Sequence, residues 1–532
     1  MSRSVGTVLR TLFYLKPKQL VYQIKYRFGI PSFSKESLKL NKENLKFNSF
    51  DYLNSSASLS KEPNQFLFLN RLVVFENKID WNYSTNGKLW LYNLNYFDFL
   101  AKPNPNFNEV GKYIKSYHDN YNSIKDGKEP YPTSLRIMNL IKIINQYDSD
   151  ELRFILKTDI KRLFQSLEFH LLGNHLLENS FALYFSSHLY PSEKKLVIQS
   201  IKLLKEQLSE QILEDGGHYE RSFMYHQIIL GRLLESISIS EANPNDWNKD
   251  VLPFLREKAK LMISWMLKMS NNGQIFQRFN DSVEHISPDT SALISLSKKL
   301  NLIHNKSIEL RESGYRILRL QDLLITANIG NITPSYQPGH AHADSLSFTL
   351  HSKGKPIIVD PGISTYENNL QRRLERSTRY HNTISINGKN NNEVWSAFRM
   401  GRRAKVTLLK DSNNYLEAEH NGYRFLKATH RRCWEIKDSK ILISDYLSTP
   451  EENTCELNIH LHPEVEIRTI NNGKYLLNND LIISFDSPSK IKLESYEYCE
   501  GFNKTRTSKR INILLNNRLT TEIFYENSFH NG

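Results

Sequence analysis

Helical periodicity dominates the chain from about residue 105 to residue 305. In LRIMNLIKIINQY (135–147) apolar residues recur at three- and four-residue spacing, as they do on one face of a helix. The same spacing recurs in 166–190, 195–213, 224–239 and 255–269, and the breakers DGG (215–217) and NPND (243–246) separate some of these stretches. Successive helices of this length with short connections predict antiparallel hairpins packed in a ring or bundle.

The pattern changes near residue 310. The stretches 317–330, 345–360 and 381–388 are short runs of strand-forming residues, and Lys353-Gly354 is a typical hairpin turn between two apolar runs. Many short strands with turn signals predict an antiparallel sandwich. Because a single core stops growing at roughly 250–300 residues, we expect a lead-in segment (1–90), a helical domain (91–308) and a β-sandwich domain (309–532).

The net charge of the chain indicates that its binding partner is an anion. The 532 residues include 70 Lys and Arg against 57 Asp and Glu, which gives a net charge of +13. A field of that sign concentrates anions, so nucleic acid, anionic lipid and acidic glycan all fit. Nucleic acid is not expected, because no motif of a nucleic-acid-binding fold is present. Three widely spaced cysteines indicate neither a zinc ribbon nor a disulfide framework.

The N-terminal stretch 8–28 is amphipathic and basic, and Arg10, Lys16, Lys18 and Lys25 break its apolar runs. A secretory signal needs ~7–15 uninterrupted apolar residues, and a membrane span needs ~18. We therefore expect no transmembrane segment and a cytoplasmic, bacterial protein, with a periplasmic or secreted location as the alternative. The stretch itself is interpreted as a helix that docks on the protein, and peripheral membrane contact is the alternative.

Histidines cluster in GHAHADSLSF (339–348). His340 and His342 are two residues apart, so on a strand they would point the same way. Asp360 follows the next apolar run in VDPG, and His381 lies in YHNT. Two imidazoles and a carboxylate are suitable zinc ligands. The alternative is that these are turn and edge residues satisfied by hydrogen bonds.

Two helical segments carry polar residues among apolar ones. In GNHLLENSFALY (173–184), Asn174 shares a helix face with Glu178, and His175 shares one with Asn179. Asn is a poor helix former, so it indicates a ligand contact or a cap, and Asn174 could be an N-cap. In EDGGHYERSFMYHQ (214–227), Tyr225 is either a functional phenol or a core residue.

A run of arginines flanks His381. It indicates either a solvated face or anion capture, and it comprises Arg372, Arg373, Arg376, Arg379, Arg399, Arg402 and Arg403.

Five segments, in this order over about residues 87–400, resemble the heparinase II/III polysaccharide lyases and their alginate-lyase-like relatives. They are LWLYNLNYFDFL, YPTSLRIMNLI, NHLLENSFAL, DGGHYERSFMYH and GHAHADSLSF…GKPIIVDPG…YHNT. The resemblance implies a multidomain α+β protein, in which an incomplete (α/α) toroid is followed by an antiparallel β-sandwich. It also implies a lyase that cleaves a uronate-containing acidic polysaccharide by β-elimination.

The resemblance also implies roles for single residues. Asn174, His175, Tyr225 and His340 match the catalytic positions. Three residues match the ligands of a structural Zn²⁺, namely His342, Asp360 and His381. We expect further substrate contacts from Arg136, Glu220, His226, Arg379 and Tyr366, and either Tyr366 or Tyr380 as a further catalytic tyrosine.

The reaction explains why these groups are needed. Removing the C5 proton of a uronate creates a dianion unless donors such as Asn174 and His175 neutralise the carboxylate. Tyr225 would act as base, as acid or as both, and as a base its pKa of ~10 must be lowered by a neighbouring His or Arg.

Two alternatives remain: a glycoside hydrolase using Glu178, Glu220 or Asp344, and a non-catalytic or glycan-processing protein of surface-polysaccharide biosynthesis.

Overall fold

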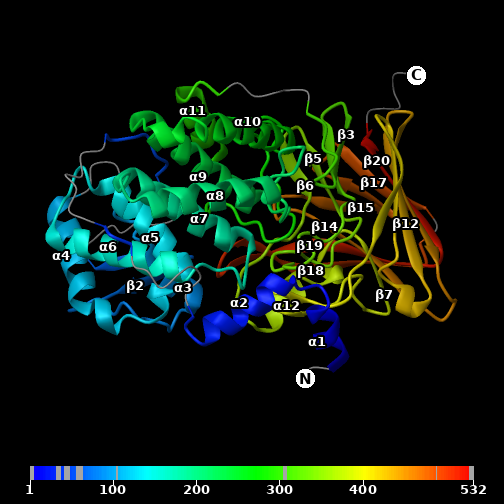
Figure 1. The fold of residues 1–532 in the computed structure, drawn as a ribbon. Helices are drawn as coiled ribbons and strands as arrows, with labels where there is room; N and C mark the ends of the chain where they lie inside the picture. Colours follow the sequence, from blue (N-terminus) through cyan, green and yellow to red (C-terminus); the bar gives the residue numbers. More distant parts are fainter. Residues whose placement is uncertain are drawn as a thin grey trace.

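The computed structural model describes residues 5–30, 38–40, 48–54, 64–102, 106–302, 308–486 and 488–526. A helical half and a β half lie side by side (Figure 1). The last helix before the change of pattern, α11, ends at Lys299, and the first strand after it, β3, begins at Tyr315. No helix in the described ranges is both long and apolar enough to span a membrane.

The helical half is built from helices that pack around one shared hydrophobic core. They are α3 (Lys88–Tyr96), α4 (Phe107–Asn120), α5 (Pro130–Ile143), α6 (Asp150–Gln165), α7 (Gly173–Leu189), α8 (Lys194–Gln211), α9 (Phe223–Ala242), α10 (Leu252–Met269) and α11 (Thr290–Lys299). The lead-in contributes α1 (Val5–Leu12), α2 (Pro17–Arg27) and a hairpin of β1 (Gln65–Phe68) and β2 (Arg71–Val74).

Helix α7 is the central element of this half, and it packs against α5, α8 and α9. All of its residues except His175 are buried, so its polar side chains need partners inside the protein. The helix expected over 166–190 begins only at Gly173, because Leu172 and Gly173 both have positive φ angles, 64° and 63°. This break places Asn174 in the first turn of α7.

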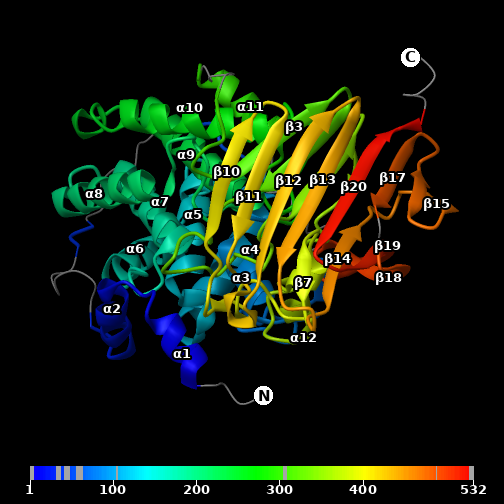
Figure 2. The ribbon, with the colours of Figure 1, turned by 90° about the vertical axis from the view of Figure 1, so that its right-hand side faces the viewer.

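The β half contains an eight-stranded sheet and two four-stranded sheets, all antiparallel in the described strands. The large sheet has the order β10-β11-β12-β13-β20-β17-β16-β15, and the small ones have the orders β3-β4-β5-β6 and β18-β19-β14-β7. Figure 2 shows the large sheet in front of the smaller ones. Buried residues of all three sheets form one core, which includes Ile325, Trp434 and Leu457.

Most strands are short, as predicted, whereas β18 and β19 have 12 residues each. Their bounds are β3 (Tyr315–Leu320), β4 (Leu323–Asn328), β5 (Phe348–Ser352), β6 (Lys355–Ile358), β7 (Ile384–Ile386), β8 (Val394–Ser396), β9 (Arg399–Met400), β10 (Val406–Ser412), β11 (Tyr415–His420), β12 (Thr429–Lys437), β13 (Lys440–Ser448), β14 (Cys455–His460), β15 (Ile467–Asn471), β16 (Lys474–Leu477), β17 (Leu481–Asp486), β18 (Lys490–Gly501), β19 (Lys504–Leu515) and β20 (Arg518–Tyr525). The predicted turn at Lys353-Gly354 joins β5 to β6, and both residues have positive φ angles.

A buried arginine joins the two halves. Arg221, just before α9, donates from Nε to the carbonyl of Ser313 (2.6 Å) and from Nη1 to the carbonyl of Asn331 (2.8 Å). The Asp215 carboxylate accepts from the Ser313 backbone N–H (2.8 Å) and hydroxyl (2.7 Å). These contacts fix the ends of β3 and β4 against the helical half.

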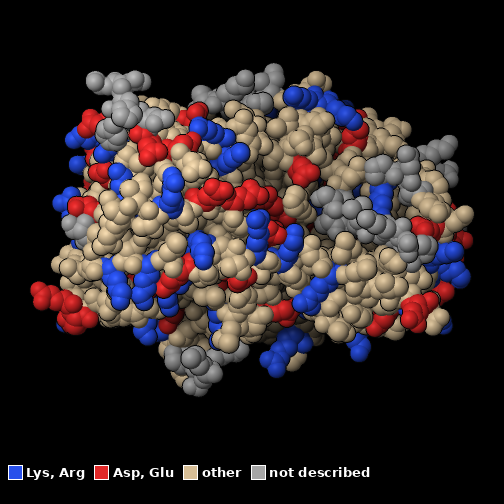
Figure 3. All heavy atoms as spheres, turned by 180° about the vertical axis from the view of Figure 1, so that it is seen from behind, with Lys and Arg blue, Asp and Glu red and all other residues tan. Residues whose placement is uncertain are grey.

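Charge is mixed over the surface seen from behind. Figure 3 shows Lys and Arg interspersed with Asp and Glu over that face. The net positive charge is therefore not gathered into a single basic patch there.

Candidate active site

One cavity of about 650 Å³ is lined by both halves of the protein. The helical half contributes Asn174, His175 and Tyr225, and the β half contributes His340 and Tyr366. The structure thus brings the four predicted catalytic residues together with one of the predicted substrate-binding residues.

The first turn of α7 positions Asn174. The backbone N–H of Asn174 donates to Oε1 of Glu220 (3.0 Å), and its Nδ2 donates to Oε2 of the same carboxylate (2.9 Å). A Cβ at Gly173 would lie 2.1 Å from Oε1 of Gln337 and 2.8 Å from Oε1 of Glu220, so only glycine fits there. The predicted N-cap role of Asn174 is wrong, because its side chain contacts Glu220 and His340.

A second buried carboxylate orients His175. Nδ1 of His175 lies 2.9 Å from Oε1 of Glu168, and Asn179 donates to the other oxygen of Glu168 (3.0 Å). Burial opposes the charge of His175, but the Glu168 carboxylate outweighs it and raises the pKa of His175 above its ordinary value. The ring is partly exposed and lines the cavity, so it can present a proton there.

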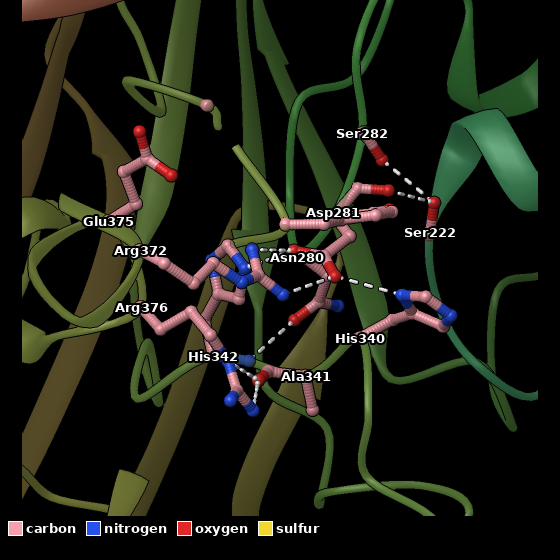
Figure 4. Close-up of polar contacts among 12 residues, drawn as sticks. Ser222, Asn280, Asp281, Ser282, His340, Ala341, His342, Arg372, Glu375 and Arg376 are labelled. Carbon is pink, nitrogen blue, oxygen red and sulfur yellow. Dashed lines mark hydrogen bonds and ion pairs between the residues drawn. The ribbon is translucent and has the colours of Figure 1, made fainter. Parts of the chain in front are cut away.

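Asp281, in the loop after α10, is the centre of the site (Figure 4). Its Oδ2 lies 2.8 Å from Nδ1 of His340, and its Oδ1 lies 2.8 Å from Nε2 of His342. Arg372 forms a bidentate ion pair with the same carboxylate, at 2.5 and 2.6 Å. Burial alone would raise the pKa of Asp281, but Arg372 and the two histidines hold it well below its ordinary value.

These partners assign the tautomer of His340. A charged Asp281 accepts a proton from Nδ1, which leaves the lone pair on Nε2. Nε2 of His340 lies 3.3 Å from Nδ2 of Asn174. His340 therefore presents a proton acceptor beside the amide. His340 and His342 lie in a loop before β5, so the prediction that they share a strand is wrong.

Tyr225 stacks on His340, with ring centroids 4.1 Å apart, and its hydroxyl lies 3.2 Å from that of Tyr366. Burial raises the pKa of Tyr225 well above that of a free phenol, and Tyr366 adds to the effect. The lowered pKa that a role as base requires is therefore not found. The raised pKa keeps the proton on Tyr225 and favours the other predicted role, that of an acid.

The predicted zinc ligands lie near one another, beneath the cavity. His342 and His381 are buried with ring centroids 5.2 Å apart, and in the described structure Nδ1 of His342 and Nε2 of His381 have no hydrogen-bond partner. Both oxygens of Asp360 already have partners: Oδ2 lies 2.8 Å from Nδ1 of His381, and Oδ1 accepts from the Gly362 N–H. Within the described ranges, no group of three or more His, Cys, Asp or Glu residues is arranged to hold a metal. Two of the predicted ligands thus offer a donor atom, and zinc stays a prediction.

Two residues predicted to contact substrate are structural instead. Arg136 is fully buried, with its Nε 2.7 Å from Oδ2 of Asp159, and its Nη1 donates to the carbonyls of Asn95 and Gly127. His226 is also fully buried, and its Nε2 contacts the Met262 carbonyl. The apolar periodicity around both residues buries them away from the cavity.

The other residues predicted to contact substrate differ in whether they line the cavity. Arg379 is half-exposed, lies 3.5 Å from Glu456 and does not line the cavity. Glu220 is buried and acts on the site through Asn174. Of the two candidate tyrosines, Tyr366 lines the cavity, whereas Tyr380 donates to the Glu497 carbonyl inside the β half.

Asp281 and Glu168 were not predicted. Glu168 lies in the link between α6 and α7 and Asp281 in the loop after α10, and no motif distinguishes either from other loop carboxylates. Only their burial beside an imidazole shows their role. Arg372 was noticed as part of a charge run, but its pairing with Asp281 depends on tertiary structure.

An incomplete toroid of helices joined to an antiparallel sandwich, with a histidine- and tyrosine-lined cavity between them, defines a structural class. Comparison with known protein families supports this class. The model described as "Heparinase II/III N-terminus" matches residues 138–301, and "Heparinase II/III-like, C-terminal" matches residues 303–525. The chain belongs to the heparinase II/III-like family.

Similar sequences and structures extend this result. A heparin-sulfate lyase of Bacteroides thetaiotaomicron is 26% identical over 372 residues, covering 58% of this chain and 50% of that protein. One from Bacteroides stercoris is 20% identical over 355 residues, covering 61% of this chain and 50% of that protein. The chain thus spans about half the length of the curated relatives it matches.

Solved structures show the fold. A crystal structure of heparinase III matches with a TM-score of 0.62 at 17% identity, covering 95% of this chain and 89% of that one. The heparan sulfate lyase HepC from Pedobacter heparinus matches with a TM-score of 0.54 at 15% identity, covering 95% and 87%. The predicted fold class, an (α/α) toroid followed by a β-sandwich, is confirmed.

Proposed function

We propose that this protein is a polysaccharide lyase that cleaves a uronate-containing acidic polysaccharide by β-elimination. The single observation that carries the proposal is the arrangement of Asn174, Tyr225 and His340 around one cavity, with Nε2 of His340 3.3 Å from Nδ2 of Asn174. Membership of the heparinase II/III-like family and the names of its relatives, heparin-sulfate lyases, support it.

Charge neutralisation is the first requirement of the reaction. The carboxylate of the sugar would lie against His175, whose raised pKa favours the protonated, donating ring. The Asn174 amide, held by Glu220 through one Nδ2 hydrogen, would add a second donor when its other Nδ2 hydrogen turns from Nε2 of His340 to the sugar carboxylate. Preorganised donors of this kind are worth about 3–4 kcal/mol each in a transition state. Together they stabilise the negative charge that develops when C5 loses its proton.

Proton transfer then needs a base and an acid. The lone pair on Nε2 of His340 faces the amide that would hold the sugar acid, so His340 takes the C5 proton. Tyr225 keeps its phenolic proton because of burial, so it protonates O4 of the departing sugar. The products are a free hydroxyl on one sugar and a C4–C5 double bond conjugated to the carboxylate on the other.

A zinc ion remains part of the proposal as a structural element. His342 and His381 would hold it through their partnerless nitrogens, with Asp360 beside them. It would fix the loops beneath the cavity, and no proton transfer involves it. The cytoplasmic location expected from the N-terminal sequence also stays a prediction.

The carboxylates considered for a glycoside hydrolase have other partners here. Glu178 lies 3.3 Å from Nε of Arg232, Glu220 holds Asn174, and the Asp344 carboxylate accepts from Asn328. A hydrolase needs one carboxylic acid and one carboxylate that flank the scissile bond. The site therefore favours elimination.

The test is a panel of heparan sulfate, chondroitin, hyaluronan and alginate, monitored for growing near-ultraviolet absorbance of the unsaturated product. Tyr225→Phe removes the proton for O4 and should lower kcat by roughly 10²–10⁴-fold with little change in KM. Tyr415→Phe, on β11 of the large sheet, is the matched control and should behave as wild type. Tight glycan binding without turnover would contradict the proposal and favour a role in polysaccharide assembly.

A further inference from the structure

The two N-terminal helices expose most of their large apolar side chains and bury a polar one each. The buried residue of α1 is Thr11 and that of α2 is Gln19, both polar. Tyr22 of α2 packs on Phe169, with ring centroids 4.6 Å apart, but most other large apolar side chains of these helices are exposed. Just after the helices, Phe13 is 87% exposed and Phe28 is 72% exposed. A helix that packs on a soluble protein normally turns its apolar face to the core. Packing on the body therefore does not explain the exposed apolar residues of this segment.

The exposed apolar residues follow helical spacing. Val5, Leu9 and Leu12 lie on one side of α1, and Leu20, Ile24 and Phe28 lie on one side of α2. The N-terminal apolar surface is defined by Val5, Leu9, Leu12, Phe13, Leu20, Val21, Ile24 and Phe28. In both Figure 1 and Figure 2, α1 and α2 lie at the lower edge of the molecule.

Polar contacts hold the opposite side of these helices on the body. Nε of Arg10 donates to Glu393 (2.8 Å), the Thr11 hydroxyl accepts from the Trp395 indole (3.0 Å), and Gln19 donates to the Leu171 carbonyl (3.3 Å). On α2, Tyr26 stacks on His170 with centroids 4.2 Å apart. The apolar surface is therefore presented in a fixed orientation.

The charge of this segment selects one kind of partner. Residues 5–30 contain five basic residues and no Asp or Glu, although the whole chain carries 57 acidic residues. Lys18, Lys25 and Arg27 lie on α2. The Lys18 and Lys25 ammonium groups lie over the rings of Phe169 (4.1 Å) and Tyr22 (4.8 Å), and Arg27 is exposed. An amphipathic helix with apolar residues on one side and Lys or Arg around them lies in the plane of an anionic bilayer, with its apolar face ~5–10 Å deep.

We propose that α1 and α2 dock this protein on an anionic lipid surface. The apolar side chains enter the interface between headgroups and acyl chains, and the basic residues of α2 meet the lipid phosphates. Helix α2 also lines the site: Gln19, Gln23 and Tyr26 form part of the cavity wall. A docked molecule thus holds its cavity next to the lipid surface.

The experiment is sedimentation of the full chain with vesicles of phosphatidylglycerol and phosphatidylcholine in equal parts, and with vesicles of phosphatidylcholine alone. Wild type should pellet with the mixed vesicles, and binding should weaken with added salt. Ile24→Glu should lower partitioning about tenfold or more, because it removes one buried apolar side chain and adds a negative charge. The matched control is Ile198→Glu, on α8: Ile198 is 61% exposed, Ile24 is 59% exposed, and the control should bind as wild type.

The charge is tested separately. Arg27→Gln should weaken binding to the mixed vesicles about fivefold, since each basic residue near an anionic surface contributes ~1 kcal/mol. Three results would overturn the proposal: no pelleting with the mixed vesicles, equal binding by Ile24→Glu, or a wild-type dimer that Ile24→Glu converts to a monomer. Because vesicle binding is read without any glycan, its failure is distinct from failure of the lyase assignment.

Discussion

Two of the imidazoles that line the cavity, those of His175 and His340, are each oriented by a buried carboxylate. Glu168 contacts Nδ1 of His175, and Asp281 contacts Nδ1 of His340. The two carboxylates affect their histidines differently. Glu168 favours a charged His175, whereas Asp281 is shared with Arg372 and fixes the tautomer of His340. One histidine is thereby suited to neutralise an acid and the other to accept a proton.

The role of Glu168 leads to a prediction about pH. Its carboxylate raises the pKa of His175, so the protonated ring persists to higher pH than a free imidazole would. Glu168→Gln removes that charge, the pKa of His175 falls, and the alkaline limb of the pH profile of kcat/KM should move to lower pH. Activity should stay near wild type at acidic pH and fall several-fold at alkaline pH.

Glu367→Gln is the control for this variant, because Glu367 also lines the cavity but does not contact His175. Its pH profile should match that of wild type. An unchanged alkaline limb in Glu168→Gln would show that the protonated form of His175 is not required.

At the scale of elements, helices of the toroid are tied by buried ion pairs. Arg136 of α5 pairs with Asp159 of α6 and donates to the carbonyl of Asn95, in α3. Glu235 of α9 lies 2.8 Å from Nζ of Lys142, also on α5. Such pairs fix the positions of the helices relative to one another. Losing one partner leaves a buried charge unpaired.

Arg136→Met should therefore destabilise the helical half by about 3–5 kcal/mol, because the Asp159 carboxylate stays buried without its guanidinium. Arg136→Met/Asp159→Leu should recover much of this loss, since no charge is left unpaired. The free energy of unfolding, measured by hydrogen exchange of α5 and α6 amides, checks both values. A rise in KM without loss of stability would instead restore Arg136 as a substrate contact.

These elements show what the sequence could and could not predict. Periodicity predicted α5, α8, α9 and the β5–β6 hairpin, because each depends on local spacing or on turn residues such as Lys353-Gly354. It placed the start of α7 too early, because the positive φ angles of Leu172 and Gly173 interrupt the helix without changing the apolar spacing. The cavity residues came from family motifs, whereas Asp281 could not be predicted, since its partners come from segments 59 and 91 residues away.

At the scale of the whole molecule, the proposed reaction depends on how the two halves meet. Tyr225 belongs to the toroid and His340 to the β half, yet their rings stack at 4.1 Å. Arg221 lies four residues before Tyr225, and it donates to the carbonyls of Ser313, just before β3, and Asn331, just after β4. The contacts of Arg221 that join the two halves are therefore close in the chain to the stacked rings of the cavity.

Arg221→Met should therefore affect stability and catalysis together. Three carbonyls, those of Ser313, Gly314 and Asn331, would lose a buried donor, at a cost of about 1–3 kcal/mol each. Hydrogen exchange of β3 and β4 should speed up, and kcat should fall because Tyr225 and His340 are no longer held together. The control is Arg319→Met, an exposed residue of β3 whose loss should change stability by less than about 0.5 kcal/mol. If both variants kept wild-type exchange and kcat, the two halves would have to be joined by contacts other than this guanidinium.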